Sequence, residues 1–117
     1  QKDEARRFFN KSLENPIDKR IAALSSYWLG AIANEKGEYA ISKQHTASFL
    51  NAAKSMTGLP EESSLMMGQY IQGYNYIKLN DYAGALGYFK QCVEGIEKNA
   101  SKIKSEQIRT AILGDAV

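Results

Sequence analysis

The sequence predicts an all-α protein built from antiparallel pairs of helices. A short phrase recurs along the 117-residue chain, centred on Gly30, again on Gly73 at 43 positions further on, and on Gly114 after another 41. A period of this size is typical of stacked helical repeats. Apolar residues recur at helical spacing between breaks rich in Gly or Pro, and no segment alternates with the period of two that a strand requires.

Six helices are expected, separated by recognisable breaks. Asn15-Pro16 is expected to begin the second helix, because Asn caps free amides and Pro suits the first helical turn. Gly37 and Asn80-Asp81 predict tight turns after the second and fourth helices. Asn99-Ala100-Ser101 is expected to connect the last two. The predicted helices cover about residues 2–14, 16–36, 38–56, 60–79, 81–98 and 101–117.

The bulk composition argues against several classes of protein. Fifteen Lys and Arg against thirteen Asp and Glu give a net charge of +2, which is too balanced to indicate nucleic acid or an acidic membrane surface as partner. No apolar run approaches the roughly 18 residues of a membrane-spanning helix, so direct membrane insertion is not expected. Both ends of the chain fall inside repeats, and we therefore expect a segment of a longer protein, whose compartment the sequence does not indicate.

No catalytic, cofactor or metal site is expected, and the chain is not predicted to be an enzyme. His45, the one histidine, has no candidate partner to orient it as a general base, and a structural or surface role is favoured. Cys92, the one cysteine, lacks an activating base and is expected to be a small buried apolar residue. Metal-ligand spacing is absent, and the glycines inside helical patterns indicate close packing rather than a phosphate-binding loop.

The recurring phrase resembles the tetratricopeptide (TPR) repeat, in which an A helix and an antiparallel B helix cross at small residues. The second full repeat matches at the small, aromatic and large positions, which are occupied by Gly73, Tyr76, Tyr82, Ala85, Phe89 and Cys92. The first matches at Gly30, Gly37 and Tyr39, whereas Ser42, Thr46 and Phe49 depart from the usual types. A Gly or Ala at a crossing lets two backbones approach, and a ring from the neighbouring helix fills the remaining space.

The resemblance implies a right-handed α-α superhelix, a TPR-like solenoid, forming one domain over residues 1–117. It divides the chain into an orphan B helix (1–14), two repeats (16–57 and 60–98) and an orphan A helix (101–117). The period exceeds the roughly 34 residues of TPR repeats. Because apolar residues continue through the extra length, we expect longer helices rather than long loops.

In TPR proteins the A helices line a concave surface that holds partners. Carried across to this chain, the groove positions are Leu24, Tyr27, Ala31, Asn34, Glu35, Met67, Tyr70, Tyr74, Ile77 and Lys78. Tyrosine offers a large contact area with a polar tip, which suits such a groove. Tyr39, Tyr76 and Tyr82 are expected to serve packing instead. The charged clamp with which some TPR domains hold a terminal carboxylate is absent, so an extended or helical peptide with apolar anchors is favoured.

The expected function is therefore that of a protein–protein interaction scaffold or adaptor, with a protein or peptide as partner. The alternative is a structural spacer that stacks on flanking repeats, in which case the exposed end helices would support self-association. In overall character the chain also resembles TPR proteins of Bacteroidetes-type bacteria, some of which are envelope lipoproteins linked to secretion or gliding motility. A bacterial periplasmic or envelope location and a cytoplasmic one both remain open.

Overall fold

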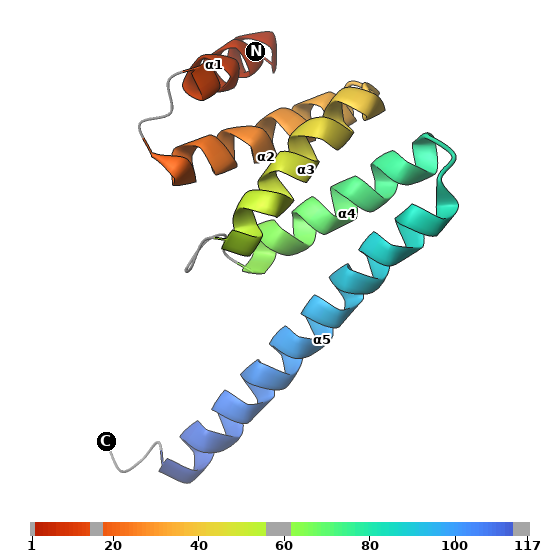
Figure 1. Ribbon diagram of the computed structural model, residues 1–117. Coiled ribbons are helices and arrows are strands. Elements are labelled where there is room, and N and C mark those ends of the chain that lie inside the picture. The colour runs from red at the N-terminus through yellow and green to blue at the C-terminus, as the bar shows by residue number, and fades with distance from the viewer. Residues whose placement is uncertain (1, 15–17, 56–61, 114–117) are drawn as a thin grey trace.

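The computed structural model describes residues 2–14, 18–55 and 62–113, which form helices and no strand. The helices are α1 (Lys2–Glu14), α2 (Lys19–Glu35), α3 (Tyr39–Ser55), α4 (Glu62–Lys78) and α5 (Tyr82–Leu113). Each helix packs on the next one along the chain, most extensively α2 on α3 and α4 on α5, and α2 also touches α4 (Figure 1). The predicted all-α class is confirmed, and the packing of adjacent helices fits a helical repeat.

The α2–α3 and α4–α5 hairpins close through the same backbone hydrogen bonds, 43 residues apart. The amide of Glu38 donates to the carbonyl of Ala33 at 2.9 Å, and the equivalent bond of the second turn measures 2.8 Å. The central turn residues adopt left-handed backbone conformations, with φ of 78° at Gly37 and 65° at Asn80. Gly enters this region without steric cost and Asn tolerates it, so both sequences support this way of ending a helix. The repeat read from the sequence is therefore present as a repeated hairpin.

Glycines lie where the paired helices cross. A Cβ added at Gly30 would lie 3.3 Å from the backbone nitrogen of Thr46 in α3. A Cβ at Gly73 would lie 2.8 Å from the ring of Phe89 in α5. Each contact joins residues 16 positions apart, so the two crossings are equivalent within the repeat. The predicted small-residue crossings are therefore present in both hairpins.

The apolar core lies between α2, α3 and α4, with Phe49 fully buried at its centre. The ring of Phe49 sits over Gly68 of α4, where an added Cβ would lie 2.8 Å from the ring edge. It also packs against Tyr27 of α2, with ring centroids 5.0 Å apart. The TPR resemblance predicts a small residue at the position of Phe49, and in the structure Gly68 on the facing helix supplies the space for the ring instead.

A buried polar network joins α2, α3 and α4. Asn75 accepts a hydrogen bond from Asn34 at 2.9 Å and donates to Ser42 and Gln72 at 2.8 and 3.1 Å. Ser42 and Gln72 in turn donate to main-chain carbonyls of α2 and α3 at 2.7 and 3.0 Å. Within the described ranges no buried side-chain nitrogen or oxygen lacks a partner. Satisfied buried networks cost little and favour one register of packing, since any slip leaves polar atoms unpaired.

Two predicted details of the helices are wrong. The α5 helix runs without interruption for 32 residues, so the connector expected at 99–101 and the separate sixth helix are absent from the described chain. Asn99, Ala100 and Ser101 all retain backbone donors and remain helical at modest cost, unlike Gly or Pro. In addition, α2 begins at Lys19 with Asp18 as its cap, and the Asp18 carboxylate accepts from the Arg20 amide. Asn15, Pro16 and Gly114 lie outside the described residues.

Candidate partner-binding surface

An apolar hollow of about 400 Å³ lies between α4 and α5. It is lined by Met66, Met67, Tyr70, Cys92 and Ile96. Tyr70 is 50% exposed and Met67 48%, so large apolar side chains at this hollow meet solvent. Met adapts its shape to varied partners, and Tyr combines a broad apolar face with a polar tip.

Small residues of α5 leave this space open. The thiol of Cys92 lies against α4 and donates to the carbonyl of Met66 at 3.6 Å. One turn further along, a Cβ added at Gly95 would approach Met66 to 3.4 Å, so α5 places no side chain there. Tyr70 leans on Phe89, with ring centroids 5.9 Å apart, which fixes one wall of the hollow. Cys92 is half-buried rather than fully buried.

The predicted groove residues of α4 fall into two groups. Met67 and Tyr70 line the hollow, whereas Tyr74, Ile77 and Lys78 lie further along the helix. The Lys78 ammonium lies 5.4 Å from the centroid of the Tyr74 ring, and that ring packs against Tyr39 of α3 at 5.9 Å. Ile77 is 37% exposed. The structure therefore brings together two of these five residues at a concave site.

The predicted groove residues of α2 are largely engaged inside the protein. Tyr27 packs on the core, Asn34 belongs to the polar network, and Glu35 forms an ion pair of 3.0 Å with Lys2 of α1. Leu24 is 39% exposed and Ala31 is half-buried. These α2 residues do not line the hollow between α4 and α5.

Sequence reasoning missed Met66, Cys92 and Ile96 as members of the hollow. The adjacent methionines 66 and 67 were a local signal of an adaptable apolar surface. The contribution of Cys92 and Ile96 depends on how α5 lies against α4, which involves contacts more than 25 residues apart in the chain. No local pattern reports such a contact.

Of the three tyrosines expected to serve packing, two pack against neighbouring side chains and one is exposed. Tyr39 and Tyr76 are half-buried, and the Tyr76 ring packs on Tyr88 at 5.1 Å with the Lys43 ammonium 4.6 Å from its centroid. The packing role is therefore confirmed for these two. It is wrong for Tyr82, which is 65% exposed at the start of α5 and donates only to Asn80 beside it, at 3.3 Å.

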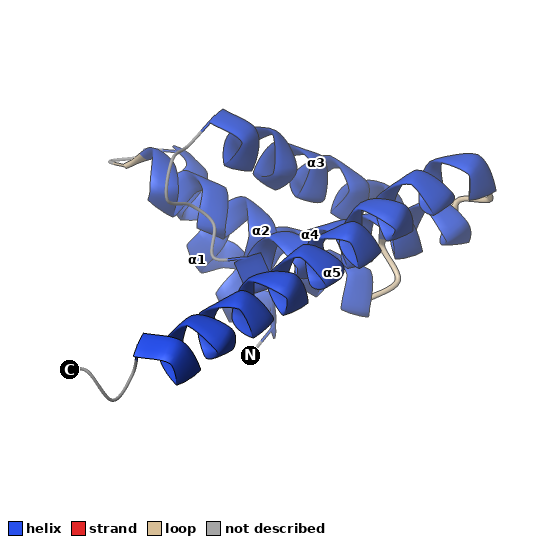
Figure 2. Cartoon of the chain, turned by 90° about the horizontal axis from the view of Figure 1, so that it is seen from below, coloured by secondary structure: helices blue, strands red, loops and turns tan. Residues whose placement is uncertain are grey.

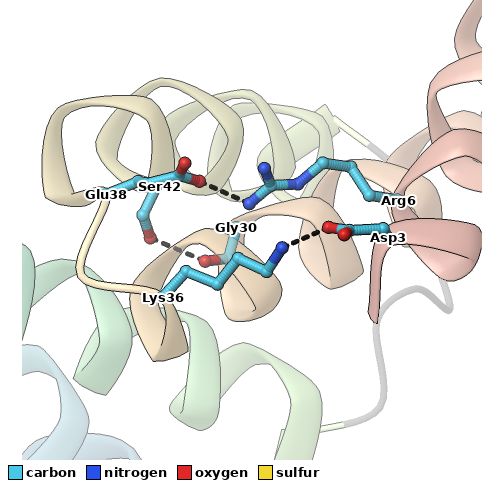
Figure 3. A network of polar contacts seen from close by, with 6 residues as sticks. All are labelled: Asp3, Arg6, Gly30, Lys36, Glu38 and Ser42. Atoms are coloured by element: carbon cyan, nitrogen blue, oxygen red, sulfur yellow. Dashed lines mark hydrogen bonds and ion pairs between the residues drawn. The ribbon is translucent and has the colours of Figure 1, made fainter. Parts of the chain in front are cut away.

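Ion pairs join the α1 helix to the hairpin α2–α3. Asp3 pairs with Lys36, and Arg6 with Glu38, as Figure 3 shows. The Lys36 ammonium, through its hydrogen bond, holds the pKa of the Asp3 carboxyl below its usual value. The Phe9 ring stacks on Trp28 at 6.4 Å, and no α1 residue is fully buried.

A second hollow of about 210 Å³ lies under α1. It is lined by Arg6, Asn10, Leu29, Ile41 and His45. Burial, and then the Arg6 guanidinium, lower the pKa of His45 below its usual value of 6.5. A third hollow of about 320 Å³, between α3, α4 and α5, has a mixed lining that includes Lys54, Gln69 and Gln91. Neither presents an exposed aromatic surface like that of Tyr70.

Across residues 2–14, 18–55 and 62–113, no three His, Cys, Asp or Glu side chains gather in a way that could hold a metal ion. In the same ranges, no helix combines the length and the hydropathy needed to cross a membrane. Comparison of the chain with protein-family models, with curated proteins and with solved structures finds no match.

Proposed function

We propose that this chain is a protein-interaction module that binds a peptide segment of a partner protein, with an apolar side chain of that segment seated between α4 and α5. The observation that carries the proposal is the hollow lined by Met67 and Tyr70, which is apolar, open to solvent and flanked by large exposed side chains. Exposed apolar surface of this kind marks interaction sites more often than plain surface.

The chemistry of the hollow defines the ligand. Its lining offers no charged group, so a Leu, Ile, Met or Phe side chain suits it better than a carboxylate or an amine. Further along α4, Tyr74 and Lys78 supply a ring and a cation that suit an acidic or polar residue of the same segment. A helical or extended peptide with one apolar anchor and a nearby acidic residue fits both features.

We also propose that the repeated hairpins belong to a TPR-like right-handed superhelix. The shared turn geometry at Gly37 and Asn80, and the equivalent crossings at Gly30 and Gly73, support this. In a second function favoured by the same repetition, the chain is a spacer whose hairpins stack on further repeats. A spacer requires no ligand at the hollow. A test of peptide binding at the hollow therefore distinguishes the two functions.

Panning a displayed random-peptide library against the purified chain tests the proposed function. We expect enriched peptides to share an apolar anchor, and expect their binding, measured by fluorescence anisotropy, to weaken by about tenfold or more in Tyr70→Ala, because hot-spot aromatic residues contribute at least that much. Met67→Glu places a charge at the mouth of the hollow and should have a larger effect.

The matched control is Phe8→Ala, which removes an aromatic residue that is 67% exposed on α1, away from the hollow. It should leave peptide binding unchanged. Peptides that bind the Tyr70 and Met67 variants as well as the parent would place the site elsewhere. A failure to enrich any peptide sequence would favour the spacer function.

A further inference from the structure

The α5 helix carries a stripe of residues spaced alternately four and three apart for most of its length. The stripe consists of Tyr82, Leu86, Phe89, Val93, Ile96, Ala100, Ile103 and Gln107. Alternating 4–3 spacing of apolar residues is the pattern of a coiled-coil seam. Leu86 is 70% exposed, Val93 and Ile96 are each 52% exposed and Ile103 is 47% exposed, so most of the stripe meets solvent in the single chain, whereas Phe89 is half-buried against α4.

Among the described residues, the second half of α5 lies clear of the other helices. Residues 101–113 are exposed at every position, and Figures 1 and 2 show this half of α5 projecting beyond the other helices. A helix covered on no side gains little from intrinsic propensity alone. Pairing with another helix along the seam would therefore stabilise this half of α5.

Two copies of α5 complement each other in one antiparallel register. In that register the layers pair Leu86 with Ile103, Phe89 with Ala100, and Val93 with Ile96, each layer occurring twice by symmetry. Every layer named is apolar. The Phe89 ring is already half-buried against α4, and the other copy adds only the small Ala100 to that layer. The flanking position brings Lys90 of one copy beside Glu97 of the other, also twice, and both side chains are exposed in the single chain.

Neighbouring arrangements are less favourable. An antiparallel shift of one heptad in one direction sets Glu97 beside Glu97, and in the other direction it sets Lys90 beside Lys90. A parallel pair in register stacks Phe89 on Phe89 and leaves two small Ala100 residues facing each other, with no opposite charges at the flanks. Charge and side-chain volume therefore select the same register.

We propose that this chain forms a closed homodimer through its α5 helices, paired antiparallel about a twofold axis near residues 94 and 95. The antiparallel arrangement sets the α4–α5 hairpin of each copy beside the projecting half of α5 in the other. The interface uses the same patch on both copies, so it closes as a dimer and does not propagate into fibres. The dimer shares Ile96 with the lining of the hollow, but it does not rest on the proposed peptide binding.

Sedimentation equilibrium of the purified 117-residue chain tests the dimer. We expect a concentration-dependent monomer–dimer equilibrium. Lys90→Glu and Glu97→Lys should each raise the dissociation constant by about tenfold, because each turns two flanking ion pairs into repulsions. The double variant Lys90→Glu/Glu97→Lys restores opposite charges and should recover parental affinity, which a loss of folding could not do. Circular dichroism checks that helicity is unchanged.

A second measurement reads the register directly. A zero-length reagent that joins amines to carboxylates should link Lys90 to Glu97 between isotopically light and heavy copies, as detected by mass spectrometry. A chain that sediments as a monomer at every concentration overturns the proposal. A dimer whose dissociation constant is unchanged by both single charge reversals also overturns it. A dimer whose cross-links join other residues overturns the register.

Discussion

At the residue scale, Gly30 is required where α2 crosses α3. A Cβ at this position would collide with the Thr46 hydroxyl and lie 3.3 Å from the Thr46 backbone nitrogen, which cannot move without separating the helices. We expect Gly30→Ala to lower the free energy of unfolding by about 1–3 kcal/mol, the usual cost of overpacking. Urea denaturation followed by circular dichroism measures the change.

The matched control is Gly87→Ala. Gly87 is exposed within α5, and a Cβ added there would meet nothing within 4 Å. The same substitution should raise the free energy of unfolding by up to about 1 kcal/mol, because Ala is the better helix former. If Gly30→Ala were as stable as the parent while Gly87→Ala behaved as expected, the close crossing of α2 and α3 would be contradicted.

The lowered pKa of His45 predicts that the folded protein loses stability in mild acid. Its pKa is lowered in the folded protein, first by burial and then by Arg6, from the usual value of 6.5. As the pH falls below about 6.5, the unfolded chain therefore takes up a proton before the folded chain does, which favours unfolding. The loss ends once the pH passes below the folded pKa, because both states are then protonated.

The measurement for His45 is the urea midpoint at about pH 7.5 and about pH 5.5, with His45→Gln as control. The variant lacks the titrating group and should lose less stability over this interval than the parent. Equal losses in the two proteins would show that His45 is not responsible. The Asp3 carboxyl, whose pKa is also lowered, acts at lower pH and is common to both proteins.

At the element scale, the polar network sets the register of α2, α3 and α4. Removal of the Asn75 amide leaves Asn34, Ser42 and Gln72 each short of a partner in or beside the core. We expect Asn75→Ala to lower the free energy of unfolding by about 2–4 kcal/mol, because buried polar groups left unpaired cost about 1–3 kcal/mol each and some relax. Asn34→Ala, at the half-exposed edge, should cost less.

Thermal or urea unfolding of both Asn variants, compared with the parent, provides the measurement. The network also predicts that Asn75→Ala lowers cooperativity, since the helices lose the groups that distinguish one register from another. A loss for Asn34→Ala equal to or greater than that for Asn75→Ala would contradict the central place of Asn75 in the network.

The helical hairpins were predictable because their determinants are local. Gly37 and Asn80 each sit within a few residues of the bonds that close their turns, and the small residues at Gly30 and Gly73 recur at a fixed spacing. The polar network was not predictable, because two of the three partners of Asn75, Ser42 and Asn34, lie 33 and 41 residues away. The continuity of α5 was missed because a run of Asn, Ala and Ser is equally acceptable in a helix and in a connector.

The candidate site was predictable only in part, because contacts between residues far apart in the chain leave no local signal in the sequence. Met67 and Tyr70 were assigned to the groove because the TPR resemblance places these A-helix positions on the concave surface, and both are exposed on α4. Glu35 and Tyr27 were assigned to the groove, yet α1 and the core engage them, and nothing near them in the chain reports those contacts.

At the scale of the whole molecule, the chain combines a packed body, α1 to the first half of α5, with an unsupported second half of α5. The body buries Phe49 and Leu29 almost completely, whereas every residue of 101–113 is exposed. Isolated helices shorter than about 12–15 residues are marginal in water. The order of this half of α5 should therefore depend on what covers it.

Amide hydrogen exchange tests that dependence. In dilute protein we expect amides of 101–113 to exchange within about tenfold of unfolded rates, because a marginal helix opens readily. As the concentration rises, the proposed dimer should slow their exchange, while the amides of α2, which the body already covers, should stay unchanged. Val93→Glu places a charge in the seam and should leave the 101–113 amides unprotected at all concentrations. Strong protection of these amides in dilute protein, or in the Val93→Glu variant, would show that the helix is stable alone and that the dimer is not what orders it.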